Sequence, residues 1–122
     1  MRETLRRHHI SFKNAFSGLS WAVTTQPNFR VHLALSTVAI VLAFLLRVSF
    51  LEIVILVFTI LLGLTVELIN TALEEMTDLI TKEWRQEAKI AKDVSAGMML
   101  LVSIGAVLIA CLIFLPHIHN IL

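Results

Sequence analysis

The sequence predicts an all-α membrane protein, in which one amphipathic helix lies on the membrane surface and three helices cross the membrane. Of the 122 residues, 57% are hydrophobic and only 16% are charged. The mean hydropathy is +0.86, so the chain holds more apolar material than a soluble domain of this size can bury. Three long segments carry no charge, and the N-terminal segment has helical periodicity. These observations exclude a soluble globular enzyme.

The candidate membrane spans are the three segments that contain no Asp, Glu, Lys, Arg or His. They lie between His32 and Arg47, between Glu52 and Glu67, and between Asp93 and His117. A helix needs about 20 residues to cross the hydrocarbon core, and only the third segment reaches that length without its flanks. We therefore expect membrane helices over about residues 29–48, 50–80 and 91–116, within a single domain of residues 1–122.

The N-terminal segment, about residues 3–25, is expected to form the surface helix. Its apolar side chains fall within about 60° on a helical wheel, and they are Leu5, Phe12, Phe16 and Leu19. A helix with one apolar stripe lies in the plane of the lipid headgroups. Because no uninterrupted apolar stretch follows its arginines, we do not interpret this segment as a signal peptide. The Gln26-Pro27 pair should end it.

The distribution of Lys and Arg predicts the orientation in the membrane. Five of these residues precede residue 31 and four lie between residues 82 and 92, whereas only Arg47 lies between the first two spans. Basic segments stay in the cytoplasm, so we expect the N-terminus and any active site to be cytoplasmic. The net charge of +1 argues against nucleic acid as a partner.

One face of the second predicted span is polar. Its members fall within about 100° of arc, and they are Glu67, Asn70, Thr71, Glu74 and Asp78. Ionisable groups in a membrane cost on the order of 3 kcal/mol near the centre, so they must face protein, water, metal or each other. One interpretation is an acidic helix end that pairs with Arg or Lys of the surface helix. The other is a site for a divalent cation and a general base, because Mg²⁺ binds hard oxygen ligands.

A second cluster, Lys92 and Asp93, lies where the basic connection enters the third span. A lysine there can neutralise phosphate oxygens, and Asp93 can orient that lysine or accept a hydrogen bond from a nucleotide hydroxyl. The alternative is a basic membrane anchor with a helix-capping carboxylate. The sequence contains no glycine-rich phosphate loop, so a nucleotide site would have to be built from side chains on helices.

These residues together resemble the prokaryotic integral-membrane diacylglycerol kinase family, which includes undecaprenol kinases. The resemblance is carried by ELINTALE at residues 67–74 with Asp78, by AKD at residues 91–93, and by NFRVH at residues 28–32. It covers roughly residues 5 to 116. It implies a homotrimer in the bacterial inner or plasma membrane that transfers the γ-phosphoryl group of Mg-ATP to the hydroxyl of a membrane lipid.

The resemblance also implies roles for individual residues. Glu67 would be the proton acceptor, that is, the general base, and Asn70 would be a supporting amide. Contacts to the nucleotide and its metal would come from Arg7, Asn14, Glu74, Glu83, Trp84, Arg85, Lys92 and Asp93. The metal would be held by Glu74 and by residue 26, where the family usually has a glutamate and this chain has Gln26. A neutral amide at that position implies weaker binding of metal or fewer ions.

Several alternatives remain open from the sequence. Diacylglycerol and undecaprenol both present a primary hydroxyl, and only residues 28–32, which resemble the undecaprenol kinases, favour undecaprenol. An ion-coupled transporter would carry its glutamate nearer the midplane than Glu67, and a non-enzymatic assembly subunit would leave the polar cluster unexplained. We interpret His32 as a packed or hydrogen-bonded histidine and Trp84 as an interface anchor that can also touch adenine. We expect a neighbouring subunit to cover Glu67 and Asn70.

Overall fold

The computed structural model describes residues 2–120, with side chains from residue 10 onward. Four helices account for almost all of this part of the chain, which contains no strand, so the predicted all-α class is confirmed. The helices are α1 (Arg2–Thr25), α2 (Pro27–Leu45), α3 (Phe50–Ile80) and α4 (Gln86–His119). Three of them, α2, α3 and α4, are long and apolar enough to cross a membrane.

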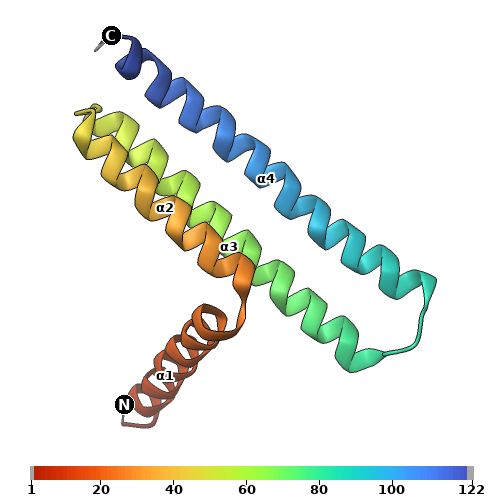
Figure 1. Cartoon of the computed structure of the whole chain (residues 1–122). Coiled ribbons are helices and arrows are strands. Elements are labelled where there is room, and N and C mark those ends of the chain that lie inside the picture. Colours follow the sequence, from red (N-terminus) through yellow and green to blue (C-terminus); the bar gives the residue numbers. More distant parts are fainter. Residues whose placement is uncertain (1, 121–122) are drawn as a thin grey trace.

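The three apolar helices lie side by side, and α1 projects away from them at the start of α2 (Figure 1). Helices α2 and α3 form a tight antiparallel hairpin, and α4 runs back along α3. The buried core lies at the hairpin end of the bundle, where α2, α3 and α4 meet. It consists of Ala43, Val48, Leu56, Ile113 and Phe114. Helix α3 extends beyond the start of α2, and its C-terminal turns run beside α4.

The boundaries of the helices have local causes. Pro27 stands at the first turn of α2, where its missing N–H is not needed and its fixed φ suits a helix. Helix α2 ends at Leu45 rather than at residue 48, since Arg47 takes a positive φ of 52° that no helix continues. Ser49 and Glu52 form a capping box at the start of α3: the Ser49 N–H donates to Glu52 Oε2 at 2.7 Å, and the Glu52 N–H donates to Ser49 Oγ at 3.4 Å.

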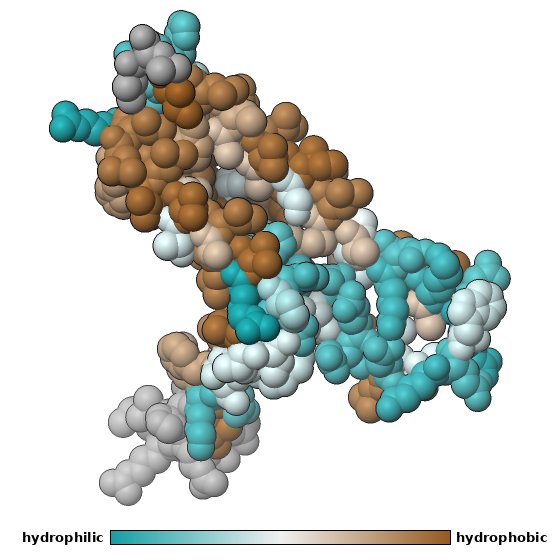
Figure 2. Space-filling model, viewed as in Figure 1, coloured by the Kyte–Doolittle hydropathy of each residue, from teal (hydrophilic) through white to brown (hydrophobic). Residues whose placement is uncertain are grey.

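The length of α3 places its polar residues relative to the membrane. Its 31 residues span about 46 Å at 1.5 Å per residue, which exceeds the hydrocarbon core of about 30 Å. If Phe50 lies at one interface, Glu67 lies about 26 Å along the helix, close to the opposite edge of the core. Glu74 and Asp78 then lie outside it. Figure 2 shows the matching surface: hydrophobic side chains cover most of the bundle, and hydrophilic ones gather at the end where α3 and α4 are connected.

Candidate active site

The polar face of α3 changes from buried to exposed along the helix. Glu67 is 2% exposed and Asn70 is 7% exposed, whereas Glu74 and Asp78 are open to solvent. The neighbouring helices of the same chain provide this burial. His32 of α2 lies beside Glu67 and Ser95 of α4 bonds Asn70, so a second subunit is not needed to bury these side chains. A neighbouring subunit at this face stays a prediction.

A chain of hydrogen bonds runs from α4 through this face. Ser95 Oγ donates to Asn70 Oδ1 at 2.5 Å, and Asn70 Nδ2 donates to Glu74 Oε1 at 3.3 Å. Asn70 thus joins a buried serine to an exposed carboxylate one helical turn farther along α3. Ser95 is not among the site residues predicted from the sequence. In the sequence, Ser95 is marked only as a polar residue one turn after Lys92 in an otherwise apolar stretch. Nothing in the sequence indicates that it lies next to Asn70.

Glu67 faces α2 through His32, whose Nε2 lies 4.0 Å from Glu67 Oε2. His32 also lines a partly open cavity of about 300 Å³ between α2, α3 and α4. Most of its lining is apolar or small, with a few hydroxyls, and includes Ser36, Thr59, Gly63, Met99 and Ala106. The buried carboxylate therefore stands beside His32 at the polar end of an apolar space that runs into the membrane-spanning part of the bundle.

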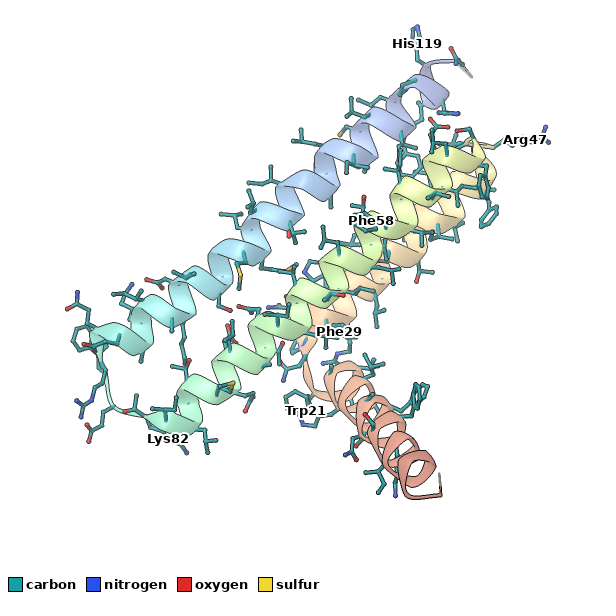
Figure 3. All side chains as sticks on the ribbon, turned by 180° about the vertical axis from the view of Figure 1, so that it is seen from behind. Trp21, Phe29, Arg47, Phe58, Lys82 and His119 are labelled. Atoms are coloured by element: carbon teal, nitrogen blue, oxygen red, sulfur yellow. The ribbon has the colours of Figure 1, made fainter. Side chains whose placement is uncertain are left out.

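The end of the bundle beyond Glu74 carries a polar depression of about 420 Å³. It lies between the last turn of α3, the connection at residues 81–85, and the first turns of α4. Five residues predicted to face the nucleotide line it, namely Glu83, Trp84, Arg85, Lys92 and Asp93. Figure 3 shows this connection, marked by Lys82, at the opposite end of the bundle from Arg47 and His119.

The cationic partners in this depression differ from those expected. Lys92 Nζ lies 2.6 Å from Asp78 Oδ1 of α3, and Asp93 pairs with Lys89 of its own helix. Asp93 therefore does not orient Lys92. Among the side chains of residues 10–120, no salt bridge joins the polar face of α3 to α1. Among the described side chains, Lys92 of α4 pairs with Asp78 of this face; pairing with the arginines near the start of α1 lies outside the described side chains.

Two predicted site residues, Asn14 and Gln26, do not line this depression. Asn14 lines a separate depression of about 500 Å³ between α1 and α3, together with Trp21, Thr71 and Glu75. Gln26 lies at the α1–α2 junction, where its Nε2 donates to Thr25 Oγ1 at 3.4 Å. The side chain of Arg7 lies outside the described residues.

The donor set at Glu74 bears on the predicted metal. Within the described part of the chain, no three His, Cys, Asp or Glu side chains lie close enough together to hold a metal ion. Glu74 offers one exposed carboxylate, with the Asn70 amide beside it. In enzymes that bind nucleotides, Mg²⁺ is commonly held by one or two carboxylates and by the phosphates of the substrate. These residues therefore fit an ion that arrives with a nucleotide, and not an ion held by protein ligands alone.

Fold and site together define a multi-span membrane protein with an enzyme-like polar centre at one end of its helical bundle. Residues 13–114 match the sequence model of the prokaryotic diacylglycerol kinase family. The chain is 40% identical over 108 residues to a diacylglycerol kinase of Synechocystis sp., a match that covers 88% of this chain and 62% of that protein. It is 36% identical over 116 residues to an undecaprenol kinase of Bacillus subtilis, covering 94% of each. Identity to a diacylglycerol kinase of Escherichia coli is 29% over 103 residues, or 84% of each chain.

The chain belongs to the prokaryotic diacylglycerol kinase family. The relatives indicate that it is a lipid kinase, a phosphotransferase whose acceptor is an alcohol. Membership of a kinase family implies ATP as the phosphoryl donor and a lipid as the acceptor. With three apolar helices of spanning length, it is a membrane protein.

Proposed function

We propose that this chain transfers the γ-phosphoryl group of Mg-ATP to the hydroxyl of a membrane lipid alcohol, preferably undecaprenol, with Glu67 as the general base. One observation carries the proposal. The carboxylate of Glu67 is buried beside His32, which also lines the apolar cavity, and the polar depression lies farther along the same helix pair. An acceptor lipid and a nucleotide can thus approach the same stretch of α3 from opposite directions.

Glu67 suits the role of proton acceptor because of where it lies. A lipid whose chain occupies the cavity would present its hydroxyl near His32, and a base must reach that hydroxyl within hydrogen-bond distance. The Glu67 carboxylate is the acidic group nearest to His32. Because Glu67 is buried, water has little access to its carboxylate. Glu67 therefore deprotonates the lipid hydroxyl with little competition from water.

The nucleotide would be held by residues farther along the bundle. Phosphoryl transfer requires mainly alignment and neutralisation of charge, and the depression offers Lys92 and Arg85 as cations. The exposed indole of Trp84 can stack on the adenine. Further contacts proposed from the family resemblance come from Arg7, Asn14, Glu83 and Asp93. Bound Mg²⁺, held by Glu74 with Gln26 as a second oxygen ligand, would supply neutralisation of the phosphate oxygens.

The preference for undecaprenol rests on the extent of similarity. The match to the undecaprenol kinase spans 94% of both chains, whereas the more identical diacylglycerol kinase is matched over 62% of its length. Residues 28–32 resemble the undecaprenol kinases as well. The apolar cavity of about 300 Å³ offers space within the bundle for a hydrocarbon chain of the acceptor.

Location and assembly follow from charge and exposure. We place α1 on the cytoplasmic surface of the bacterial inner or plasma membrane, because its apolar residues Phe12 and Phe16 are exposed and the basic segments favour the cytoplasm. We also propose a homotrimer, as the family resemblance implies. A side chain added at Gly97 or Gly105 of α4 would meet nothing within 4 Å, so this surface is open to close packing by another helix.

The test is a phosphoryl-transfer assay in detergent micelles with labelled ATP and Mg²⁺, in which undecaprenol and diacylglycerol are offered separately. We expect transfer to both lipids, faster to undecaprenol, and loss of transfer in Glu67→Gln without loss of ATP binding. Glu87→Gln removes an exposed carboxylate of the same polar end and serves as the control. Retained turnover in Glu67→Gln would remove Glu67 from the mechanism, and no transfer by the wild type would refute the kinase proposal.

A further inference from the structure

Ser95 makes a different hydrogen bond from the threonines within α2 and α3 whose hydroxyls are bonded. Hydroxyls inside helices usually donate to a carbonyl oxygen of their own helix four residues back. Thr37 donates to Leu33 O, Thr59 to Ile55 O and Thr77 to Leu73 O in this way. Ser95 is fully buried, yet its hydroxyl crosses from α4 to the Asn70 side chain of α3.

The bond to Ser95 determines which way the Asn70 amide faces. An amide group has one acceptor end and one donor end. Since the Ser95 hydroxyl donates to Asn70 Oδ1, the amide nitrogen is directed to Glu74 Oε1. The opposite orientation would place the amide oxygen against the Glu74 carboxylate, where two acceptors repel. Ser95 and Glu74 therefore hold the two ends of one rigid group.

We propose that Ser95 is a positioning residue, whose hydroxyl fixes the Asn70 amide and, through it, the carboxylate of Glu74. This inference rests on the proposed function, which assigns Glu74 to the metal of Mg-ATP. Glu74 lies on an exposed part of α3, and without the amide hydrogen bond its carboxylate can adopt several rotamers. Partners that orient a metal ligand change metal affinity by about 10-fold to 100-fold when they are removed.

The test measures metal binding directly, with Mn²⁺ as the probe. Purified protein in micelles is titrated with Mn²⁺ in the presence of a non-hydrolysable ATP analogue, and free Mn²⁺ is followed by electron paramagnetic resonance. We expect Ser95→Ala to weaken Mn²⁺ binding about 10-fold and to raise the Mg²⁺ concentration for half-maximal activity by a similar factor. The kcat at saturating Mg²⁺ should change little. Ser95→Thr keeps the hydroxyl and should bind Mn²⁺ as the wild type does.

Two further variants separate positioning from packing. Asn70→Ala should weaken Mn²⁺ binding, and adding Ser95→Ala to it should cause no further loss, because Ser95 acts through Asn70. Thr37→Ala, which removes a hydroxyl bonded to its own helix, should leave Mn²⁺ binding unchanged. If Ser95→Ala does not fold, Ser95→Cys, with a weak donor of similar shape, replaces it.

The outcomes distinguish this inference from the proposed function. Wild-type affinity in Ser95→Ala, with only a lower unfolding temperature, would reduce Ser95 to a packing residue and overturn the inference. Additive losses in the double variant would overturn it as well. If the wild type bound no Mn²⁺ and phosphorylated no lipid, the proposed function would fail, and the role of Ser95 would fail with it.

Discussion

Lys92 of α4 and Asp78 of α3 form an ion pair, with Lys92 Nζ 2.6 Å from Asp78 Oδ1. The pair joins the two longest helices beyond the apolar part of the bundle, where α3 no longer has α2 as a neighbour. Both side chains are about half exposed, and exposed pairs contribute little to stability. Lys92 can therefore exchange the Asp78 carboxylate for a phosphate group with little loss of folding stability.

The first prediction concerns this lysine. Lys92→Met should raise the KM for ATP at least about 10-fold, because a charge-assisted contact to a phosphate is lost, and the KM for the lipid should stay unchanged. Arg47→Met removes a cation at the opposite end of the bundle and is the matched control. Steady-state kinetics with ATP and lipid varied in turn give both constants.

The partner of Lys92 provides the second arm of this experiment. Asp78→Asn removes a carboxylate that competes with phosphate for the same ammonium group, so the KM for ATP should fall about two- to threefold or stay unchanged. A KM that rises in Asp78→Asn would instead mean that Asp78 orients Lys92. An unchanged KM in Lys92→Met would exclude Lys92 from the nucleotide site.

The sequence predicts the architecture of this protein well because charge is scarce in it. Three uncharged segments mark the three apolar helices, and the Gln26-Pro27 pair marks the break between α1 and α2. The polar face of α3 follows from helical periodicity alone, since Glu67 and Asn70 are one turn apart. Such features depend only on residues that are close together in the chain.

The pairings between helices could not be predicted in this way. Which residue of α4 lies opposite Asn70 depends on how α4 is shifted along α3, and sequence periodicity does not report that shift. Hence neither the bond from Ser95 to Asn70 nor the pairing of Lys92 with Asp78 is predicted from the sequence, which offers Asp93 only as one candidate to orient Lys92. The burial of Glu67 within one chain depends likewise on the packing of α2 and α4 around α3.

The second prediction concerns the residue at the α1–α2 junction. Gln26→Glu introduces a carboxylate where the family usually has one, so the Mg²⁺ concentration for half-maximal activity should fall several-fold. A Mg²⁺ titration of phosphoryl transfer at saturating ATP measures it. Thr25→Glu adds the same charge one residue earlier and should have a smaller effect. Equal effects of both substitutions would show that only the local charge matters, and that residue 26 is not a ligand.

The third prediction concerns the start of α3. Ser49→Ala removes the side-chain acceptor of the capping box and should lower the free energy of unfolding by about 1 kcal/mol. Ser49→Asp keeps an acceptor at the same position and should keep most of the stability. Thermal unfolding in micelles followed by circular dichroism measures both variants. Phosphoryl transfer per folded molecule should be unchanged, because Ser49 lies at the hairpin end of the bundle; lost activity would contradict the placement of the site.

The last prediction tests the apolar cavity as the place of the lipid chain. Ala106 lines it from α4 together with Gly63 of α3, and Ala106→Phe would fill much of its volume of about 300 Å³. We expect a large rise in the KM for undecaprenol with unchanged ATP binding, because the hydrocarbon chain loses its space while the polar depression is untouched. Leu108→Phe adds a similar ring on the exposed face of the same helix and is the control.

A short-chain alcohol, which needs no cavity, should be phosphorylated equally by both variants and the wild type. If Ala106→Phe binds and phosphorylates undecaprenol normally, the chain of the acceptor lies elsewhere, and the open face of α4 becomes the surface to examine.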